Sequence, residues 1–558
     1  MMKTNGELSL YLSDKKLTRL CLEDGSTFVT QNFDIQTSSK DAPKLDDIIE
    51  HVQGLSAMVG KDVQVSIVAQ SIVETMREMM ATNQTQEKSP QKTTELGERL
   101  MAVCQSAVDL NASDIHIEIY REQTRYLMRV DGERELLSLF HNNESAEHRP
   151  RDEGVSLISY VFSTLGDKDV KLRDPANDRF ELALHWQGEP KFFEWRAALI
   201  PLNRGVKLTL RCLTPRDKPL NIDDMDLPIP YVKTLRKYLQ KRNGGIVICG
   251  PVGSGKSTLA NGLLCEIDSV ARSVHCMEDP VEFELPFVCK TTVEPDKEIQ
   301  AGSKMYRDYA FYTKETLRHD VDVALIGEVR DNAAALQFCR KGEVGGLAIT
   351  TLHTNSAYGV PQTFIESLGV PAAVVGAPDL MLMFVHQRLV KKLCDCALPF
   401  EADSTALAYE KAGLSGAYHA KRQHITQLFY QEIKADKKPK SKRSDECQGQ
   451  LYQPLQDVSH IRFANPIGCS KCDGKGERGR LSVIEIIVLE AEDRRLIAKN
   501  DIHGWLAHLE KLNWPDISAH TRSRIKQGQV DVTSAAKQID SLLPQKSNTV
   551  YQQMQEAL

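Results

Sequence analysis

Hydrophobic residues between residues 96 and 215 indicate a mixture of one helix and several short strands. Leu96–Leu110 predicts a helix, whereas Ile115–Ile119 and Tyr126–Val130 alternate apolar and polar side chains as half-buried strands do. Asp131-Gly132 follows the second strand directly and is a strong signal for a tight hairpin turn. We therefore expect a compact α+β domain in this part of the chain.

From about Ile222 onward, strand signals alternate with helix signals. The segment from Ser257 to about Val270 has the length and composition of a helix, and it follows a short apolar run. Four such runs are expected to be buried strands: Gly245–Cys249, Val274–Met277, Val323–Ile326 and Leu347–Thr350. This alternation predicts an α/β fold with a parallel sheet and crossover helices.

Two polar stretches mark boundaries, and a third is charged. Asn83–Lys92 has the composition of a linker, and the prolines of Thr214–Pro219 predict a hinge. Lys434–Glu446 is a charged run that could touch an anionic lipid surface, although a solvated loop is the better interpretation. The expected organisation comprises a domain at 1–82, a linker at 83–95, the α+β domain at 96–215, a hinge at 216–221, the α/β core at 222–390, a cysteine-containing module with a long insertion at 391–480 and a helical region at 481–558.

Length and composition narrow the class of protein. A chain of 558 residues is too long for one core, and 41% apolar residues with a formal charge of −6 describe an ordinary multidomain protein that is unsuited to coating DNA. The amino terminus has no apolar segment typical of a signal peptide, and no window reaches the ~18 apolar residues of a membrane span. We therefore expect a cytoplasmic protein, whose 13 cysteines are mostly free thiols.

A complete phosphate-loop motif, G-x-x-x-x-G-K-S, lies between the first core strand and the helix that follows it. Glycines let the backbone fold around phosphate, and the helix adds the positive end of its dipole. Lys256 would reach the β- and γ-phosphates of ATP, and the Ser257 hydroxyl would ligate Mg²⁺. The expected nucleotide-binding residues are Gly250, Pro251, Val252, Gly253, Ser254, Gly255, Lys256, Ser257 and Thr258.

The other core strands end in polar residues that belong at the same edge of the sheet. Glu278–Glu282 follows the second strand, Glu328 the third and His353 the fourth. Ligands bind at the carboxyl ends of parallel strands, so these side chains are candidates for handling Mg²⁺, water and the γ-phosphate. Taken alone, the acidic segment could also be a surface turn, and His353 could be a structural histidine.

Taken together, the motifs resemble those of the hexameric ATPases of type II secretion and type IV pilus assembly. GPVGSGKST, EDPVE, LRHDVDVALIGEVRD, ITTLHTNSA and HQRLVKKLC occur in the order and at the spacing typical of that family, and ASDIHIE and RVDG resemble the signature of its preceding domain. The resemblance covers residue 96 to the carboxyl terminus. It implies a RecA-like ATPase core, a smaller PAS-like α+β domain before it, and an amino-terminal domain that docks onto a partner.

The resemblance also assigns roles to individual residues. It implies that Glu282 polarises the attacking water, that Glu328 is the Walker B carboxylate and that His353 is the histidine of the histidine box. Arg196 and Arg211 resemble the family arginines that swing onto the nucleotide phosphates. Two departures concern details: Gly345-Gly346 stands where the family usually has Gly-His, and Lys314 replaces an arginine common four residues before Arg318. Neither departure touches Lys256, Glu282 or Glu328, so we expect an active enzyme.

Two cysteine pairs fit a structural zinc site of the kind that assembly-type members of this family carry. Cys394 and Cys396 form a CxC pair, and Cys469 and Cys472 form a CxxC pair followed by a glycine- and arginine-rich stretch. Four thiolates make a closed tetrahedral site suited to tethering loops. Cys447 is a rival ligand, and loss of the metal is the alternative.

Retraction-type relatives are typically shorter and lack both the extra amino-terminal domain and the cysteine module. The resemblance therefore implies an extension-type motor that assembles a pilus or pseudopilus. As an ATPase it would use ATP and Mg²⁺ and form a homohexamer on the cytoplasmic face of the inner membrane. It would contact a membrane platform protein, and an adaptor, through residues 1–82, and it would act on a pilin or pseudopilin indirectly, with no nucleic acid. Residues 1–82 contain no chemical motif, so a plain folding domain is the alternative to a docking domain there. A DNA-transfer ATPase of the related type IV secretion group and a nucleotide-gated scaffold with little turnover are the alternatives.

Overall fold

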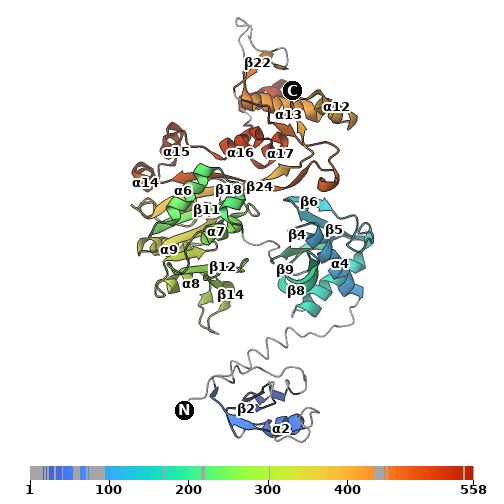
Figure 1. Cartoon of the computed structure of the whole chain (residues 1–558), viewed down its shortest axis with the longest axis vertical. Helices are drawn as coiled ribbons and strands as arrows, with labels where there is room; N and C mark the ends of the chain where they lie inside the picture. Colours follow the sequence, from blue (N-terminus) through green and yellow to red (C-terminus); the bar gives the residue numbers. More distant parts are fainter. Residues whose placement is uncertain are drawn as a thin grey trace. The chain divides into compact units, whose positions relative to one another are not determined.

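The structure is a computed structural model (Figure 1) that describes residues 17, 20–21, 24–30, 33–40, 42–53, 63–70, 73, 95–166, 170–214, 220–300, 302–432, 445–447, 450–455, 457–544 and 547–556. The chain divides into two compact units, Met1–Arg99 and Leu100–Leu558. Most of the expected linker, of the expected hinge and of the charged run at Lys434–Glu446 lies outside the described residues.

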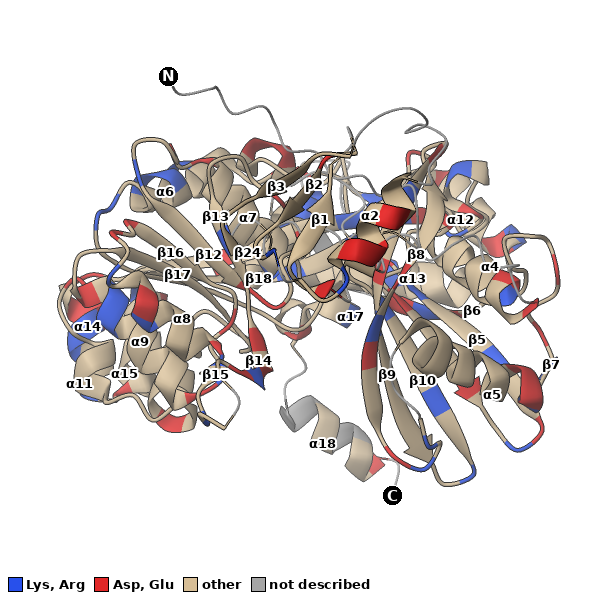
Figure 2. Cartoon of the chain, turned by 90° about the horizontal axis from the view of Figure 1, so that it is seen from below, with Lys and Arg blue, Asp and Glu red and all other residues tan. Residues whose placement is uncertain are grey.

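The amino-terminal unit contains a small three-stranded sheet and a helix. Strand β1 (Thr27–Val29) pairs antiparallel with β2 (Ile35–Thr37), which pairs parallel with β3 (Val65–Ile67). Helix α2 (Leu45–Gln53) buries Ile48 and Val52 in the same cluster as Phe28 and Ile35, and its opposite side carries acidic residues (Figure 2).

The expected α+β domain lies almost entirely in the second unit, and its first helix begins five residues before the boundary. Helix α4 (Glu95–Asp109) precedes an antiparallel sheet of order β6-β5-β4-β10-β9-β8, with β7 also pairing with β5. The hairpin is confirmed, because Val130 lies opposite Glu133, and Asp131 and Gly132 have φ values of 48° and 87°, as in a tight turn of two left-handed residues. The other elements of the domain are β4 (Asp114–Ile119), β5 (Gln123–Val130), β6 (Glu133–Leu136), β7 (Arg149–Pro150), α5 (Arg151–Ser159), η2 (Tyr160–Leu165), β8 (Ala176–Trp186), β9 (Glu189–Leu202) and β10 (Gly205–Cys212).

The core is a RecA-like sheet of order β13-β12-β16-β17-β11-β18-β24 (Figure 1). All neighbouring strands are parallel except β18 and β24. The strands are β11 (Gly244–Cys249), β12 (Val274–Glu278), β13 (Cys289–Thr292), β16 (Val323–Ile326), β17 (Leu347–Leu352), β18 (Met381–Leu393) and β24 (Glu477–Val488). The helices of this part are η3 (Ile222–Met225), α6 (Ile229–Leu239), α7 (Lys256–Cys265), α8 (Tyr309–Thr316), α9 (Asn332–Glu343), α10 (Val360–Gln362), η4 (Thr363–Ser367) and α11 (Ala372–Val375), and β14 (Glu294–Glu298) pairs with β15 (Tyr306–Arg307).

The core differs from the sequence expectation in two places. Helix α7 ends at Cys265, short of the expected Val270. Beyond this end, the Asp268 side chain accepts hydrogen bonds from the backbone N–H groups of Val270 and Ala271 and closes a turn. Residues 390 and 480, the expected ends of the core and of the cysteine-containing module, fall inside β18 and β24. These two long strands pair along their length, so the sheet continues past both positions.

Two helices occupy the segment between Phe400 and Phe463, in which the hydrophobic pattern is weak: α12 (Asp403–Lys411) and α13 (Ser415–Phe429). The pattern is masked because α13 buries Lys421, which pairs with Asp531 at 2.5 Å. The remaining elements are β19 (Leu398–Pro399), β20 (Tyr430–Glu432), β21 (Asp445–Cys447), β22 (Gln450–Pro454), β23 (Arg462–Phe463), η5 (Ser470–Cys472), α14 (Ala491–Ala498), α15 (Ile502–Lys511), α16 (Ile517–Lys526), α17 (Val532–Gln538), η6 (Asp540–Leu542) and α18 (Ser547–Glu556). Within the described ranges, none of the helices combines the length and the apolar character needed to cross a bilayer.

Candidate nucleotide site

The phosphate loop joins the buried strand β11 to helix α7. Gly250, Gly253 and Gly255 have φ values of 150°, 75° and 85°, a region that strongly favours glycine. A Cβ at Gly250 would lie 2.4 Å from the Gln387 carbonyl oxygen, so no larger residue fits there. Val252 and Gly253 are exposed at the tip of the loop, Ser254 is buried, and Pro251 and Thr258 are half-buried. This loop can therefore present backbone N–H groups and the start of α7 to phosphate.

Lys256 is a buried cation beside the loop, with 8% of its surface exposed. Its Nζ donates to the carbonyl oxygens of Gly250 and Pro251 at 2.9 and 3.0 Å and lies 3.4 Å from His353 Nδ1. Burial lowers the pKa of this ammonium group, and the charge of Glu328 opposes the shift. Among the described residues, no carboxylate lies within ion-pair distance of it. A buried ammonium of this kind is suited to an anionic ligand such as a phosphate.

Ser257 and Glu282 are direct neighbours, because the serine hydroxyl donates to the glutamate carboxylate. Burial raises the pKa of Glu282, the charge of Glu278 raises it further, and Lys290 and this hydrogen bond oppose the shift. A half-buried carboxylate with a raised pKa is a better proton acceptor than an exposed one. The pair thus combines a hydroxyl ligand that suits Mg²⁺ with a candidate base.

His353 connects Lys256 to the carboxylate that follows β16. Its Nε2 lies 3.2 Å from Oε1 of Glu328, whose other oxygen accepts from Arg330 Nη2 at 2.7 Å. With Nδ1 facing the Lys256 ammonium, the neutral ring that carries its proton on Nε2 satisfies both contacts. Contacts thus join Lys256, His353 and Glu328, while Ser257, the next residue after Lys256, contacts Glu282. These five residues follow the strands β11, β12, β16 and β17, and we call them the nucleotide cluster.

A second buried group lies beside this cluster. The side chains of Glu278 and Lys290 are 7% and 3% exposed and form an ion pair at 2.8 Å. Lys290 also donates to Asn261 Oδ1 at 2.7 Å, and Asn261 Nδ2 donates to the Ser257 carbonyl oxygen at 3.0 Å. Sequence reasoning missed Lys290, because its partner Glu278 lies 12 residues earlier and no local pattern pairs the two.

The two candidate arginines are placed differently. Arg196 Nη2 donates to Asp279 Oδ1 at 3.1 Å, in the acidic segment of the core, whereas Arg211 Nε donates to Asp114 at 2.7 Å within its own domain. Arg179 was not expected, yet its Nη2 donates to the same Asp279 oxygen at 3.0 Å. Register alignment places Arg179, Arg196 and Arg211 side by side on β8, β9 and β10, and basic residues are visible on β9 and β10 in Figure 2.

The structure shows the surroundings of the two positions at which the sequence departs from the family pattern, Gly345-Gly346 and Lys314. Gly345 has a φ of 105°, and a Cβ at Gly346 would lie 2.4 Å from Cε of Lys341, a buried lysine that donates to the Val321 carbonyl oxygen. The space of a larger side chain at position 346 is therefore already filled. Lys314 is exposed in the last turn of α8.

The four predicted cysteine ligands lie together, with all sulfur atoms within 4.8 Å of one another. The Sγ–Sγ distances are 3.7 Å for Cys394–Cys469, 3.9 Å for Cys396–Cys472 and 3.8 Å for Cys469–Cys472. Tetrahedral zinc with Zn–S bonds of about 2.3 Å requires sulfurs roughly 3.8 Å apart, so this geometry fits the ion. Burial raises the pKa of the Cys472 thiol, but backbone N–H groups of Cys469 and Gly476 hold it at about 7. The side chain of Cys447 lies outside the described residues.

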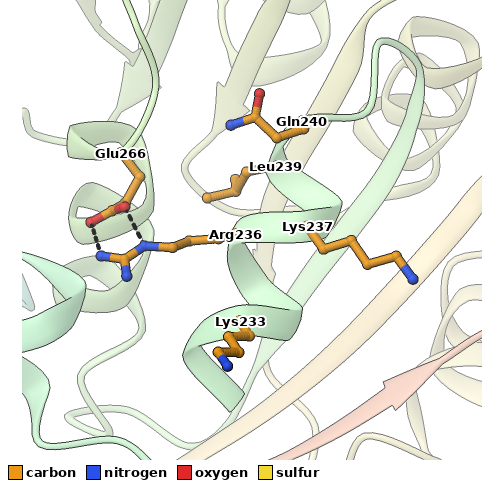
Figure 3. A pocket seen from close by; sticks show the side chains of 6 residues that line it. All are labelled: Lys233, Arg236, Lys237, Leu239, Gln240 and Glu266. Carbon is orange, nitrogen blue, oxygen red and sulfur yellow. Dashed lines mark hydrogen bonds and ion pairs between the residues drawn. The ribbon is translucent and has the colours of Figure 1, made fainter. Parts of the chain in front are cut away.

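A separate cavity of about 340 Å³ lies between α6 and α7 (Figure 3). Arg236 is engaged there by Glu266 and Asp223, both at 2.7 Å, and Lys233 and Lys237 point away from each other. This basic surface is not part of the nucleotide cluster.

Comparison with known proteins identifies the family. Residues 88–540 match the family "Type II/IV secretion system protein". The chain is 27% identical over 403 residues to type II secretion system protein E of Pectobacterium carotovorum subsp. carotovorum, covering 72% of this chain and 67% of the relative. It is 26% identical over 392 residues to the type IV pilus assembly ATPase PilB of Thermus thermophilus, covering 69% and 36% of the two chains.

A solved structure supports the same fold. The ATPase DotB of Legionella pneumophila superposes with a TM-score of 0.50 and 15% identity, covering 81% of this chain and 97% of that one. Family, fold and phosphate-loop site agree: this chain belongs to the type II/IV secretion system protein family and is an ATPase of secretion or pilus assembly.

Proposed function

We propose that this ATPase is an extension-type motor that drives assembly of a type IV pilus or of the pseudopilus of type II secretion. The observation that carries the proposal is the cluster of Lys256, Ser257, Glu282, Glu328 and His353, which two arginines from the preceding domain approach through Asp279. The four-cysteine cluster and the separate amino-terminal unit support the assembly type over a retraction type.

Each residue of the cluster has one task in hydrolysis. The loop N–H groups and Lys256 would bind the phosphates of ATP. The Ser257 hydroxyl would hold Mg²⁺, which would supply positive charge to the site. Glu282 accepts the proton of the attacking water, which its raised pKa favours. Glu328 would act as the Walker B carboxylate on the Mg²⁺ side of the phosphates. The orientation of the His353 ring is fixed because Lys256 and Glu328 contact its two nitrogens.

The arginines couple chemistry to movement. Arg179 and Arg196 share one oxygen of Asp279, a carboxylate whose side chain is 10% exposed. A γ-phosphate carries more negative charge than a single carboxylate, so it would draw these guanidinium groups away from Asp279. Hydrolysis and phosphate release would return them. The α+β domain would therefore shift against the core once per turnover, which is the displacement that a motor needs.

The four cysteines would hold one structural zinc ion. All four positions of a tetrahedral ion would be filled by Cys394, Cys396, Cys469 and Cys472, leaving none for substrate. The ion would tie the end of β18 to the start of β24, two strands whose connection spans the whole inserted segment. We assign it a mechanical role, as a rigid link next to the core sheet.

The test is ATPase activity and oligomeric state of the purified chain, with and without the cytoplasmic part of its candidate inner-membrane platform protein. We expect a homohexamer whose activity rises with the platform domain and is lost in Glu328→Gln. Activity that responds to DNA and not to the platform domain would favour the DNA-transfer alternative. If the protein stays inactive under all conditions and Glu328→Gln behaves in the same way, the proposed motor function is refuted. The nucleotide-gated scaffold would then be the remaining interpretation.

A further inference from the structure

Glu485 is a buried carboxylate in β24 that joins two distant segments. It is 2% exposed. Its Oε1 accepts the backbone N–H of Ala357 at 2.6 Å, and its Oε2 accepts that of Ile517 at 2.9 Å. Ala357 lies in the loop after His353, and Ile517 is the first residue of helix α16. One side chain therefore ties the loop that follows β17 to a helix of the carboxyl-terminal region.

The sheet places Glu485 in line with the nucleotide site. Leu352 lies opposite Cys249, Cys249 opposite His386, and His386 opposite Glu485, so these residues form one row across β17, β11, β18 and β24. The row lies at the carboxyl ends of β11 and β17. Leu352 directly precedes His353, and Cys249 directly precedes Gly250 of the phosphate loop.

The loop from His353 to Gly359 is fixed at its far end and engaged with the site at its near end. Ala357 is fully buried, and the Ser356 carbonyl oxygen accepts a weak bond from Cys249 Sγ at 3.5 Å. The ring of Tyr358 packs edge-on against Trp514 with centroids 6.3 Å apart, and Trp514 Nε1 donates to the Ile486 carbonyl oxygen at 3.0 Å. At the near end, His353 contacts Lys256 and Glu328.

We propose that Glu485 is a positioning residue of the ATPase site: it sets the loop that carries His353 and links that loop to helix α16. The inference rests on the role proposed above for His353. A carboxylate offers one acceptor oxygen to each of the two N–H groups, whereas an amide would turn an NH₂ donor towards one of them. An acidic residue therefore suits both contacts at once. A change at the γ-phosphate that moves His353 would be passed to α16 through this group.

The surroundings of Glu485 are compatible with a neutral side chain at this position. Burial and the charge of Asp516 raise its pKa to about 7, while the two backbone N–H groups and Arg388 on β18 oppose the shift. Tyr231 on α6 and Cys249 on β11 also feel its charge, and His386 is its neighbour on β18. At a pKa of about 7 the protonated form is populated alongside the carboxylate near neutral pH. The fold therefore accommodates an uncharged group here, and Glu485→Gln should fold.

The test compares steady-state ATPase kinetics of Glu485→Gln with two other variants. We expect kcat to fall about tenfold with KM within roughly twofold of the parent, the effect of about one hydrogen bond lost from the arrangement of the site. Asp493→Asn is the matched control: Asp493 is equally buried and accepts from Glu490 N at 2.7 Å and Trp505 Nε1 at 2.8 Å, but it does not touch the loop. It should keep its kcat.

The outcomes separate this inference from the proposed function. His353→Ala with unchanged kcat would remove the role of His353 on which the inference depends. Two results would overturn the positioning role if His353→Ala is slow. In the first, Glu485→Gln has the parental kcat. In the second, Glu485→Gln loses kcat only together with ATP binding, and by as much as Asp493→Asn does.

A spectroscopic readout tests the link itself, with Trp514→Phe as the blank. ATP binding should change the emission of Trp514 in the parent, and Glu485→Gln should lose most of that change. An equal change in both proteins would contradict the link.

Discussion

The buried ion pair between Glu278 and Lys290 allows a quantitative test of the electrostatics beside the nucleotide site. Both side chains are almost inaccessible, and the ammonium group is also bound to Asn261. Replacing Lys290 by Met keeps the length of the side chain but leaves the Glu278 carboxylate buried without its cation. Removing one partner of such a pair costs about 3–5 kcal/mol of unfolding free energy.

The double variant Glu278→Gln/Lys290→Met separates the pair from its packing. Replacing both charges removes the uncompensated carboxylate, so most of the lost stability should return. For a core of this size, the single variant should lower the melting temperature by on the order of 10 °C, and the double variant by only a few degrees. Differential scanning calorimetry of the full chain at neutral pH measures both values.

Lys297→Met is the matched control for the single change. Lys297 pairs with Glu294 at 2.5 Å on the neighbouring β14, but the lysine side chain is 65% exposed, and surface pairs contribute typically ~0.2–1 kcal/mol. If Lys290→Met melts no lower than Lys297→Met, water reaches the Glu278 carboxylate and the predicted cost of an unpaired buried charge is refuted. If the double variant is as unstable as the single one, packing and not charge is the cause.

Three further predictions concern the base, the metal and pH. Glu282→Gln should lower kcat about 100-fold or more, because the water loses its proton acceptor; the exposed Glu284→Gln is the control, and equal activities would refute the assignment. Cys469→Ser should abolish the expected content of one zinc per chain in elemental analysis, whereas the exposed Cys289→Ser should retain it; unchanged zinc in the first variant would remove Cys469 from the site. The pKa of Glu485 is raised to about 7 from 4.5, so the folded state binds this proton more tightly than the unfolded state does. The free energy of unfolding should therefore rise by up to about 3 kcal/mol as the pH falls from above 7 towards 4.5. Urea unfolding should therefore show the parent gaining stability over Glu485→Gln as the pH is lowered across this window, and a pH-independent difference would contradict the raised pKa.

Local signals predicted the central part of the fold well. The strand before the phosphate loop, the three later core strands and the Asp131-Gly132 hairpin occur where periodicity and turn chemistry put them. Such elements depend on residues that are neighbours in the chain. Helix α13 was not predictable in this way, because its buried Lys421 interrupts the apolar pattern and is compatible with burial only through Asp531, 110 residues later.

The sequence by itself determined the phosphate loop, the carboxylates and histidine at the strand ends, and the cysteine spacing, because parallel strands bring their carboxyl ends to one edge whatever surrounds them. Only the tertiary structure decided that Arg179 joins Arg196 on Asp279, and that Lys290 and Glu485 serve the site from the interior. Their partners are distant in sequence, and a charged residue is stable when buried only if the fold supplies the matching group. No local pattern records that match.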